Sequence, residues 1–253
     1  MALPLRKLSS PAPDRARLAR LADELEEASP QEILARAFDE FTDGISIATG
    51  FGAEGMALID MAVRIDPAVD VFFIDTGFLF PETYELRRRV EEKYKITIRA
   101  FKPQLTPHAQ ERLFGPALWE RNADLCCQIR KLEPLEDALE GLVAWVTAIR
   151  RDQTVARASA QAIEWDERWG LAKINPLIRW SKREVWDYLK SNDVPFNPLH
   201  LRGYPSIGCT HCTRAVREGE DDRAGRWSGR EKTECGLHAE TTASKLWIAP
   251  VKI

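Results

Sequence analysis

Five cysteines are the residues whose type and spacing most directly indicate chemistry. Cys126 and Cys127 are adjacent, and Cys209 and Cys212 form a C-x-x-C pair further along the chain. Four thiolates in two local pairs can surround one metal centre, either zinc or an iron–sulfur cluster. Adjacent thiolates fit a cluster, whose irons are spread over space, better than one zinc ion. The alternative is that Cys126 and Cys127 are buried apolar residues and the C-x-x-C pair is a redox dithiol.

The fifth cysteine, Cys235, lies in a polar stretch near the C-terminus, between Lys232 and His238. A thiol beside cations and a histidine keeps thiolate character, and the thiolate is the nucleophilic form. The pattern therefore indicates a nucleophile, and the plainer alternative is a spare surface thiol.

The composition favours a reducing compartment for these thiols. The odd cysteine count argues against a structural disulfide framework. The N-terminus lacks the apolar core of a signal peptide, and no apolar run approaches the ~20 residues of a membrane helix. The net charge of −3 gives no basic field for a nucleic-acid backbone. We therefore expect a cytoplasmic protein with no membrane and no nucleic-acid partner.

The sequence predicts strands that alternate with helices, and these elements must position the cysteines. Apolar runs and capping signals predict strands at 44–48, 69–74, 95–100 and 141–149, and helices at 14–28, 30–41, 56–65, 81–94 and 182–191. This alternation predicts an α/β fold with a doubly wound, mostly parallel sheet. After about residue 192, proline and glycine become frequent, which predicts a loop-rich C-terminal tail.

Three segments are expected at the edge of this sheet where ligands bind, because each follows the carboxyl end of a strand. They are the glycine-rich loop from Thr49 to Glu54, then Asp75–Gly77, and then Arg150–Arg157. A glycine loop before a helix exposes N–H groups that suit a phosphate, although a tight turn without a ligand explains it equally well. The arginines and lysines near these segments indicate a focused pocket for a small anion.

Taken together, these strings resemble the adenylyl-sulfate (APS) reductases, within the phosphoadenylyl-sulfate (PAPS) reductase family. The matching strings run in family order from about residue 45 to 238: Thr49–Glu54, Ile74–Gly77, Cys126–Lys131, Arg150–Gln153, Gly203–Arg214 and Glu234–His238. The loop departs from the family, which more often has Ser-Phe-Ser-Gly-Ala-Glu-Asp where this chain has Thr-Gly-Phe-Gly-Ala-Glu-Gly.

The resemblance implies a fold of the adenine-nucleotide alpha hydrolase or ATP-pyrophosphatase type. It implies an N-terminal helical extension at 1–28, a nucleotide-binding reductase domain at 29–215 and a mobile C-terminal segment at 216–253. It also implies thiol-dependent reduction of adenosine 5'-phosphosulfate to sulfite and AMP, in assimilatory sulfate reduction and cysteine biosynthesis. Cys235 would be the nucleophile and would form an S-sulfocysteine intermediate.

The cofactor that the resemblance implies is one [4Fe–4S] cluster per chain, on Cys126, Cys127, Cys209 and Cys212. The implied electron donor is reduced thioredoxin or a glutaredoxin-type protein, and the implied assembly is a homo-oligomer. The residues expected to bind the substrate are Thr49, Gly50, Phe51, Gly52, Glu54, Asp75, Thr76, Gly77, Lys131, Arg157, Arg223, Arg226 and His238.

Three alternatives remain beside this interpretation. The substrate could be PAPS, or both APS and PAPS. The chain could be an ATP-pyrophosphatase-type sulfurtransferase, which would require ATP and a basic surface for tRNA. It could also be a non-catalytic iron–sulfur or zinc module, in which the loss of Cys235 would have no consequence.

Overall fold

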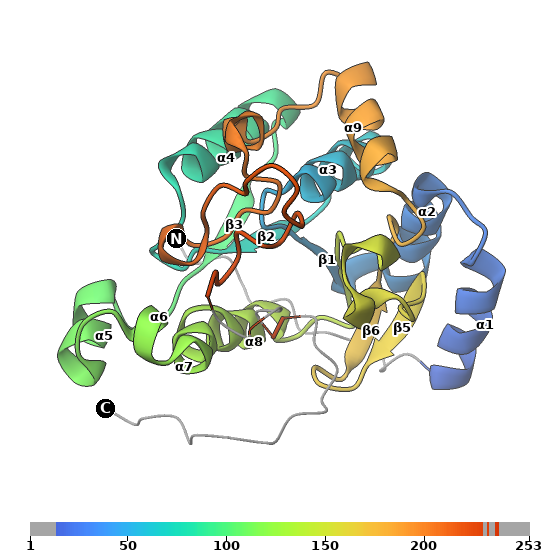
Figure 1. Cartoon of the computed structure of the whole chain (residues 1–253). Coiled ribbons are helices and arrows are strands. Elements are labelled where there is room, and N and C mark those ends of the chain that lie inside the picture. Colours follow the sequence, from blue (N-terminus) through green and yellow to red (C-terminus); the bar gives the residue numbers. More distant parts are fainter. Residues whose placement is uncertain (1–13, 230–231, 233–235, 238–253) are drawn as a thin grey trace.

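One mixed sheet forms the centre of the molecule (Figure 1). The computed structural model describes residues 14–229, 232 and 236–237. Within these residues, six strands are arranged in the order β3-β2-β1-β4-β6-β5. Neighbouring strands are parallel except β5, which pairs antiparallel with β6. The strands are β1 (Ile45–Ala48), β2 (Val71–Ile74), β3 (Ile98–Phe101), β4 (Ala144–Val146), β5 (Ile163–Asp166) and β6 (Leu171–Ile174).

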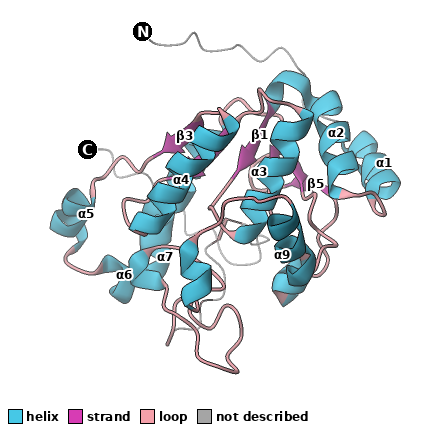
Figure 2. Ribbon diagram, turned by 90° about the horizontal axis from the view of Figure 1, so that it is seen from above, coloured by secondary structure: helices cyan, strands magenta, loops and turns pink. Residues whose placement is uncertain are grey.

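Helices cover both faces of the sheet, as expected of a doubly wound fold (Figures 1 and 2). In Figure 1, α3, α4 and α9 lie above the sheet and α8 lies below it. The helices of the described residues are α1 (Arg15–Leu25), α2 (Pro30–Phe41), α3 (Ala53–Ile65), α4 (Pro81–Tyr94), α5 (Pro107–Phe114), α6 (Leu118–Arg121), α7 (Ala123–Cys127), α8 (Glu133–Leu139) and α9 (Lys182–Ser191).

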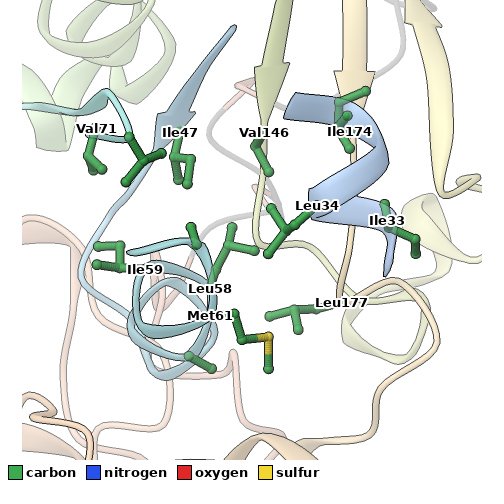
Figure 3. Packing of buried hydrophobic residues seen from close by; sticks show 14 of the residues in the cluster. Ile33, Leu34, Ile47, Leu58, Ile59, Met61, Val71, Val146, Ile174 and Leu177 are labelled. Atoms are coloured by element: carbon green, nitrogen blue, oxygen red, sulfur yellow. The ribbon is translucent and has the colours of Figure 1, made fainter. Parts of the chain in front are cut away.

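The core has two parts because alternate residues of a strand face opposite sides of the sheet. In β2, Val71 and Phe73 join the main apolar cluster, whereas Phe72 joins a second cluster with Trp145 and residues of α8. Figure 3 shows the main cluster, in which side chains of α2 and α3 meet those of the sheet. This packing fixes the carboxyl ends of β1, β2 and β4, which carry the candidate site.

The first helix belongs to the same core. Leu18, Leu21 and Ala22 of α1 are buried in the main cluster. Arg151 donates to Glu26, just after this helix, at 2.6 Å. None of the helices in the described part of the chain is long and apolar enough to cross a membrane.

The predicted α/β fold is confirmed, and the hairpin of β5 and β6 is the main feature that the sequence pattern did not indicate. Its strands lack a purely apolar pattern because they include a charged pair. Lys173 is buried and pairs with Glu164 across the hairpin at 2.7 Å. The predicted strand at 141–149 is shorter in the structure, where β4 spans Ala144–Val146. The helices α5 to α8 were also not expected, since each has no more than eight residues.

Candidate functional site

The three expected segments lie at one edge of the sheet. β1 pairs in parallel with both β2 and β4, so the loops that follow these three strands leave the sheet on the same side. Glu54, in the first turn of α3, forms an ion pair with Arg150, which follows β4. This contact joins the first and third segments directly. The side chain of Arg150 is only 6% exposed and also donates to Asp152 at 2.9 Å.

The glycine-rich loop presents its backbone rather than its largest side chain. The Phe51 ring is buried in the core, edge-on to Phe73 with ring centres 5.3 Å apart. The Phe51 N–H donates to the Thr49 hydroxyl at 3.1 Å. Gly50 is exposed, and Gly52 precedes α3 without a side-chain cap. Uncapped N–H groups at a helix N-terminus can bind an anionic group of a ligand.

The segment after β2 connects this edge to the cysteines. Asp75 accepts hydrogen bonds from the Tyr84 hydroxyl at 2.6 Å and from the Gly77 N–H at 3.1 Å. Burial of the Tyr84 hydroxyl, followed by its hydrogen bond to Asp75, raises the pKa of Tyr84. Thr76 is buried, and its hydroxyl lies 3.4 Å from the sulfur of Cys209.

The four clustered cysteines line one small cavity, with a volume of about 10 Å³. Cys126 and Cys127 end α7, whereas Cys209 and Cys212 flank a 3-10 turn far along the chain. Three of them are buried, and Cys212 is half-buried. The pKa of Cys126 is raised to about 12, mainly by burial and then by the nearby thiols of Cys127, Cys209 and Cys212. The fold therefore brings together two pairs that are distant in sequence.

A buried arginine lies beside these thiols. Arg130 lines the same cavity and is 2% exposed. Its Nε donates to Gln110 at 2.7 Å and its Nη1 to the carbonyl of Leu105 at 3.0 Å. Its Nη2 is buried without a hydrogen-bond partner among the described residues. A buried cation needs anionic charge nearby, and deprotonated thiols can provide it.

Three aromatic rings complete the wall of the cavity, and the sequence analysis did not identify them. Trp119 of α6 stacks on His211 with ring centres 3.9 Å apart. Phe78 meets both rings edge-on, and the Arg130 guanidinium lies 4.9 Å from the centre of the Phe78 ring. The position of His211 inside the C-x-x-C pair is the local signal that could have indicated it, whereas Trp119 is brought in only by tertiary packing.

Two of the expected substrate-binding cations converge on one buried tryptophan. The Lys131 Nζ lies 5.9 Å from the centre of the Trp227 ring, and the Arg226 guanidinium lies 4.5 Å from it. Trp227 is 2% exposed, and its backbone N–H donates to the Cys212 carbonyl at 3.1 Å. Arg226 packs directly on Gly208, where a Cβ would lie 2.3 Å from its Nη2. These cations therefore adjoin the cysteine cavity.

The remaining expected site residues are more scattered. Arg157 is buried in a 3-10 turn after β4 and bonds to Gln153, whereas Arg223 is half-buried in the turn that leads to Arg226. Cys235 and His238 lie outside the described residues. No group of three or more His, Cys, Asp or Glu side chains in the described part of the chain is arranged around a single metal ion.

Sequence comparison relates the chain to sulfonucleotide reductases. Residues 44–215 match the model of the phosphoadenosine phosphosulfate reductase domain. An adenosine 5'-phosphosulfate reductase from Halalkalibacterium halodurans is 48% identical over 215 residues, which cover 85% of this chain and 93% of that protein. A phosphoadenosine 5'-phosphosulfate reductase from Gloeobacter violaceus is 43% identical over 229 residues, 89% of this chain and 95% of that protein.

Solved structures show the same fold. The phosphoadenylyl-sulfate (PAPS) reductase from Candida auris, in a phosphate complex, superposes with a TM-score of 0.73 at 35% identity and covers 82% of this chain and 100% of that chain. An FMN adenylyltransferase from Candida glabrata shares the fold alone, with a TM-score of 0.56 at 14% identity over 87% of this chain and 77% of that one. With its domain match and close relatives, the chain belongs to the phosphoadenosine phosphosulfate reductase family.

Proposed function

We propose that this protein reduces adenosine 5'-phosphosulfate to sulfite and AMP with electrons from a dithiol, in the assimilation of sulfate into cysteine. The observation that carries the proposal is the arrangement of the four clustered cysteines around one cavity, beside Lys131 and next to the carboxyl edge of the sheet. The relatives named adenosine 5'-phosphosulfate reductase, at 48% and 50% identity, support APS as the substrate.

We infer that the cavity holds one [4Fe–4S] cluster, with Cys126, Cys127, Cys209 and Cys212 as its ligands. The donor set fits this group, because four cysteines from two segments line one cavity. The buried Arg130 beside them has an Nη2 without a hydrogen-bond partner among the described residues. When bound, the cluster would link the two cysteine-bearing segments covalently. Its charge would also act on groups at the carboxyl edge of the sheet, where the substrate is proposed to bind. The electrons for the reaction come from thiols, not from this group.

The chemistry follows from the mixed phosphate–sulfate anhydride of APS, whose sulfur is electrophilic. The Cys235 thiolate attacks that sulfur, so an S–S bond forms and the S–O bond to AMP breaks, with AMP leaving with the electron pair. One thiolate of reduced thioredoxin, or of a glutaredoxin-type donor, then attacks the Cys235 sulfur and releases sulfite. The second thiol of the donor closes its disulfide, so two thiols supply two electrons.

In the first step an anionic thiolate must approach an anionic sulfate, and nearby cations reduce the repulsion between them. We assign charge neutralisation to Lys131, Arg157, Arg223 and Arg226, of which Lys131 and Arg157 are buried. Buried, preorganised cations act more strongly than exposed ones because water screens them less. His238 is assigned to the same substrate contacts.

The nucleotide is assigned to the loops after β1 and β2. The backbone N–H groups of the Gly50–Gly52 loop and the uncapped start of α3 bind phosphate, and Asp75–Gly77 adjoins the adenosine. Glu54 acts through its ion pair with Arg150, which ties the loop after β4 to this one. We also propose that the chain divides into an N-terminal helical extension at 1–28, a reductase domain at 29–215 and a C-terminal segment at 216–253, and that it assembles as a homo-oligomer.

The experiment measures sulfite released from APS with reduced thioredoxin, for the native protein and for Cys235→Ser. We expect turnover by the native protein and none by the variant. Iron analysis of the same preparation should find about four irons per chain and broad absorption near ~400 nm. A colourless protein with one zinc would refute the cluster, and full sulfite release by Cys235→Ser would refute the nucleophile.

A second candidate substrate is PAPS, because one relative at 43% identity carries the name phosphoadenosine 5'-phosphosulfate reductase. A parallel arm of the same assay with PAPS decides between the two. Faster sulfite release from PAPS than from APS at equal concentration would assign the protein to PAPS reduction. Consumption of ATP without either sulfonucleotide would instead favour a sulfurtransferase.

A further inference from the structure

The two residues that follow Cys235 contact the body of the domain. Leu237 packs against the second apolar cluster, on the side of the sheet covered by α8. That cluster consists of Phe72, Leu135, Ala138, Leu139, Trp145 and Leu171. Gly236 lies beside Leu132, whose side chain is 3.7 Å from the position of a Cβ on Gly236. This contact stabilises the docked position of Leu237, because it removes apolar surface from water.

A polar contact holds the same two residues from the other side. Arg168 Nη1 donates to the Gly236 carbonyl at 2.7 Å. The Arg168 guanidinium also lies 4.7 Å from the centre of the Trp169 ring. A hydrogen bond from a charged donor is stronger than one between neutral groups. We call Arg168, Leu132 and the second apolar cluster the tail-docking site.

The turn that carries Arg168 is held in a fixed conformation by the β5–β6 hairpin. The Asp166 carboxylate accepts hydrogen bonds from the N–H groups of Arg168 at 3.1 Å and Trp169 at 3.3 Å. The Gly170 N–H donates to the Asp166 carbonyl at 2.8 Å. Because these bonds fix the turn, Arg168 reaches the Gly236 carbonyl from a rigid support.

The tail-docking site adjoins the residues proposed to contact the substrate. Leu132 directly follows Lys131, which lines the cysteine cavity. On the other side of residues 233–235, Lys232 forms an ion pair with Asp124 of α7 and lies 5.7 Å from the centre of the Trp227 ring. The chain is therefore held at residue 232 and again at residues 236–237, along the α7–α8 side of the sheet.

We propose that the tail-docking site positions the Cys235 thiol for attack on APS, with Arg168 and Leu237 as positioning residues. The inference rests on the proposed function. Cys235 is bonded to Gly236, so whatever fixes Gly236 restricts the space that the thiol searches, and such restriction accelerates a reaction between bound groups. Gly236 suits this place because its φ of +83° is one that other residues rarely adopt.

The test mixes the iron-loaded protein with saturating APS and no reductant, quenches the reaction at intervals, and measures the SO₃ adduct on the Cys235 peptide by mass spectrometry. We expect Arg168→Ala and Leu237→Ala each to slow adduct formation by about five- to tenfold, the effect of losing one solvent-exposed hydrogen bond or one partly buried apolar contact. The APS concentration at half-maximal rate should change less than twofold. Arg168→Lys should recover most of the rate, because it keeps a charged donor.

The matched control is Arg88→Ala, which removes an exposed arginine from a pair with Glu85 on α4. This variant should form the adduct at the native rate. If the native protein forms no adduct on Cys235, the proposed function itself fails. If the native protein forms it and Arg168→Ala and Leu237→Ala are equally fast or faster, the tail-docking site does not position the thiol and this inference is overturned.

Discussion

Among single residues, Glu54 and Arg150 form the ion pair that joins two loops of the candidate site. The Arg150 side chain is 6% exposed and that of Glu54 is 21% exposed, so water compensates little when the pair is broken. Asp152 remains as a second partner of Arg150 at 2.9 Å. The pair therefore contributes to stability and fixes the spacing of the loops after β1 and β4.

We predict that Glu54→Gln lowers the free energy of unfolding by about 1–3 kcal/mol, because a buried guanidinium loses one of its two carboxylates. Urea unfolding measures this change. The matched control is Glu85→Gln, which breaks the exposed pair with Arg88 on α4 and should cost less than about 0.5 kcal/mol. Equal losses for the two variants would show that burial of the Glu54 pair has no energetic consequence.

Some residues of the candidate site could be predicted from the sequence, and others could not. The four clustered cysteines have recognisable spacing, and the structure places all four around one cavity. Trp119 and Arg168 have no such signal, since each reaches its partners through packing between distant segments. Glu54 was expected to contact the substrate, and the structure shows its carboxylate engaged with Arg150. A pattern in sequence indicates a residue's chemistry but not which partner it will meet.

At the level of elements, local signals predicted the helices with strong boundaries. Ser29 with Glu32, and Ser181 with Glu184, form the capping boxes that begin α2 and α9. The hairpin of β5 and β6 was missed because its pairing is stabilised across strands, by Lys173 and Glu164, and not by an apolar pattern within one strand. Short helices such as α6 depend on tertiary packing, which a single sequence does not reveal.

The segment between α9 and the C-x-x-C pair carries a half-buried histidine, His200, that should make the free energy of unfolding depend on pH. The Nδ1 of His200 lies 2.9 Å from the Tyr204 carbonyl. Burial lowers the pKa of His200, while the charge of Glu54 opposes that shift. Below about pH 6.5, His200 therefore binds a proton more readily in the unfolded chain than in the folded chain. Stability contributed by neutral His200 is present above that pH and is lost as the pH falls.

We predict that the free energy of unfolding falls between pH 7 and pH 5 by less in His200→Gln than in the native protein. The difference is at most about 1.4 kcal/mol per pH unit for one group. Urea unfolding at several pH values measures it. His108→Gln, at an exposed position on α5, is the control and should keep the native pH dependence. Identical slopes for the native protein and His200→Gln would contradict the assignment.

For the whole molecule, the proposed cluster links the α7 segment to the loop around Cys209 and Cys212. A group that binds only the folded protein stabilises it by mass action. Burial and the neighbouring thiols raise the pKa of Cys126 to about 12, so binding of the proposed cluster would have to displace a proton from this thiol. We therefore expect the stability of the fold to depend on occupancy of the cavity by the proposed cluster.

Removal of iron by a chelator should lower Tm by about 5 °C or more, because the two segments lose their common link. Differential scanning calorimetry of the loaded and the stripped protein measures the shift. Reconstitution with iron and sulfide should restore the original Tm, whereas the same treatment of Cys212→Ser should not. An unchanged Tm after complete loss of iron would show that the fold does not depend on the cluster.

The transfer of a sulfonate group to Cys235 is the central step of the account, and the mass of the protein after mixing with APS alone tests it most directly. With no reductant present, the sulfite cannot leave, so the adduct should accumulate. We predict one SO₃ group per chain on the peptide that contains Cys235, with one equivalent of AMP released. An unmodified peptide together with released AMP and sulfite would contradict the account.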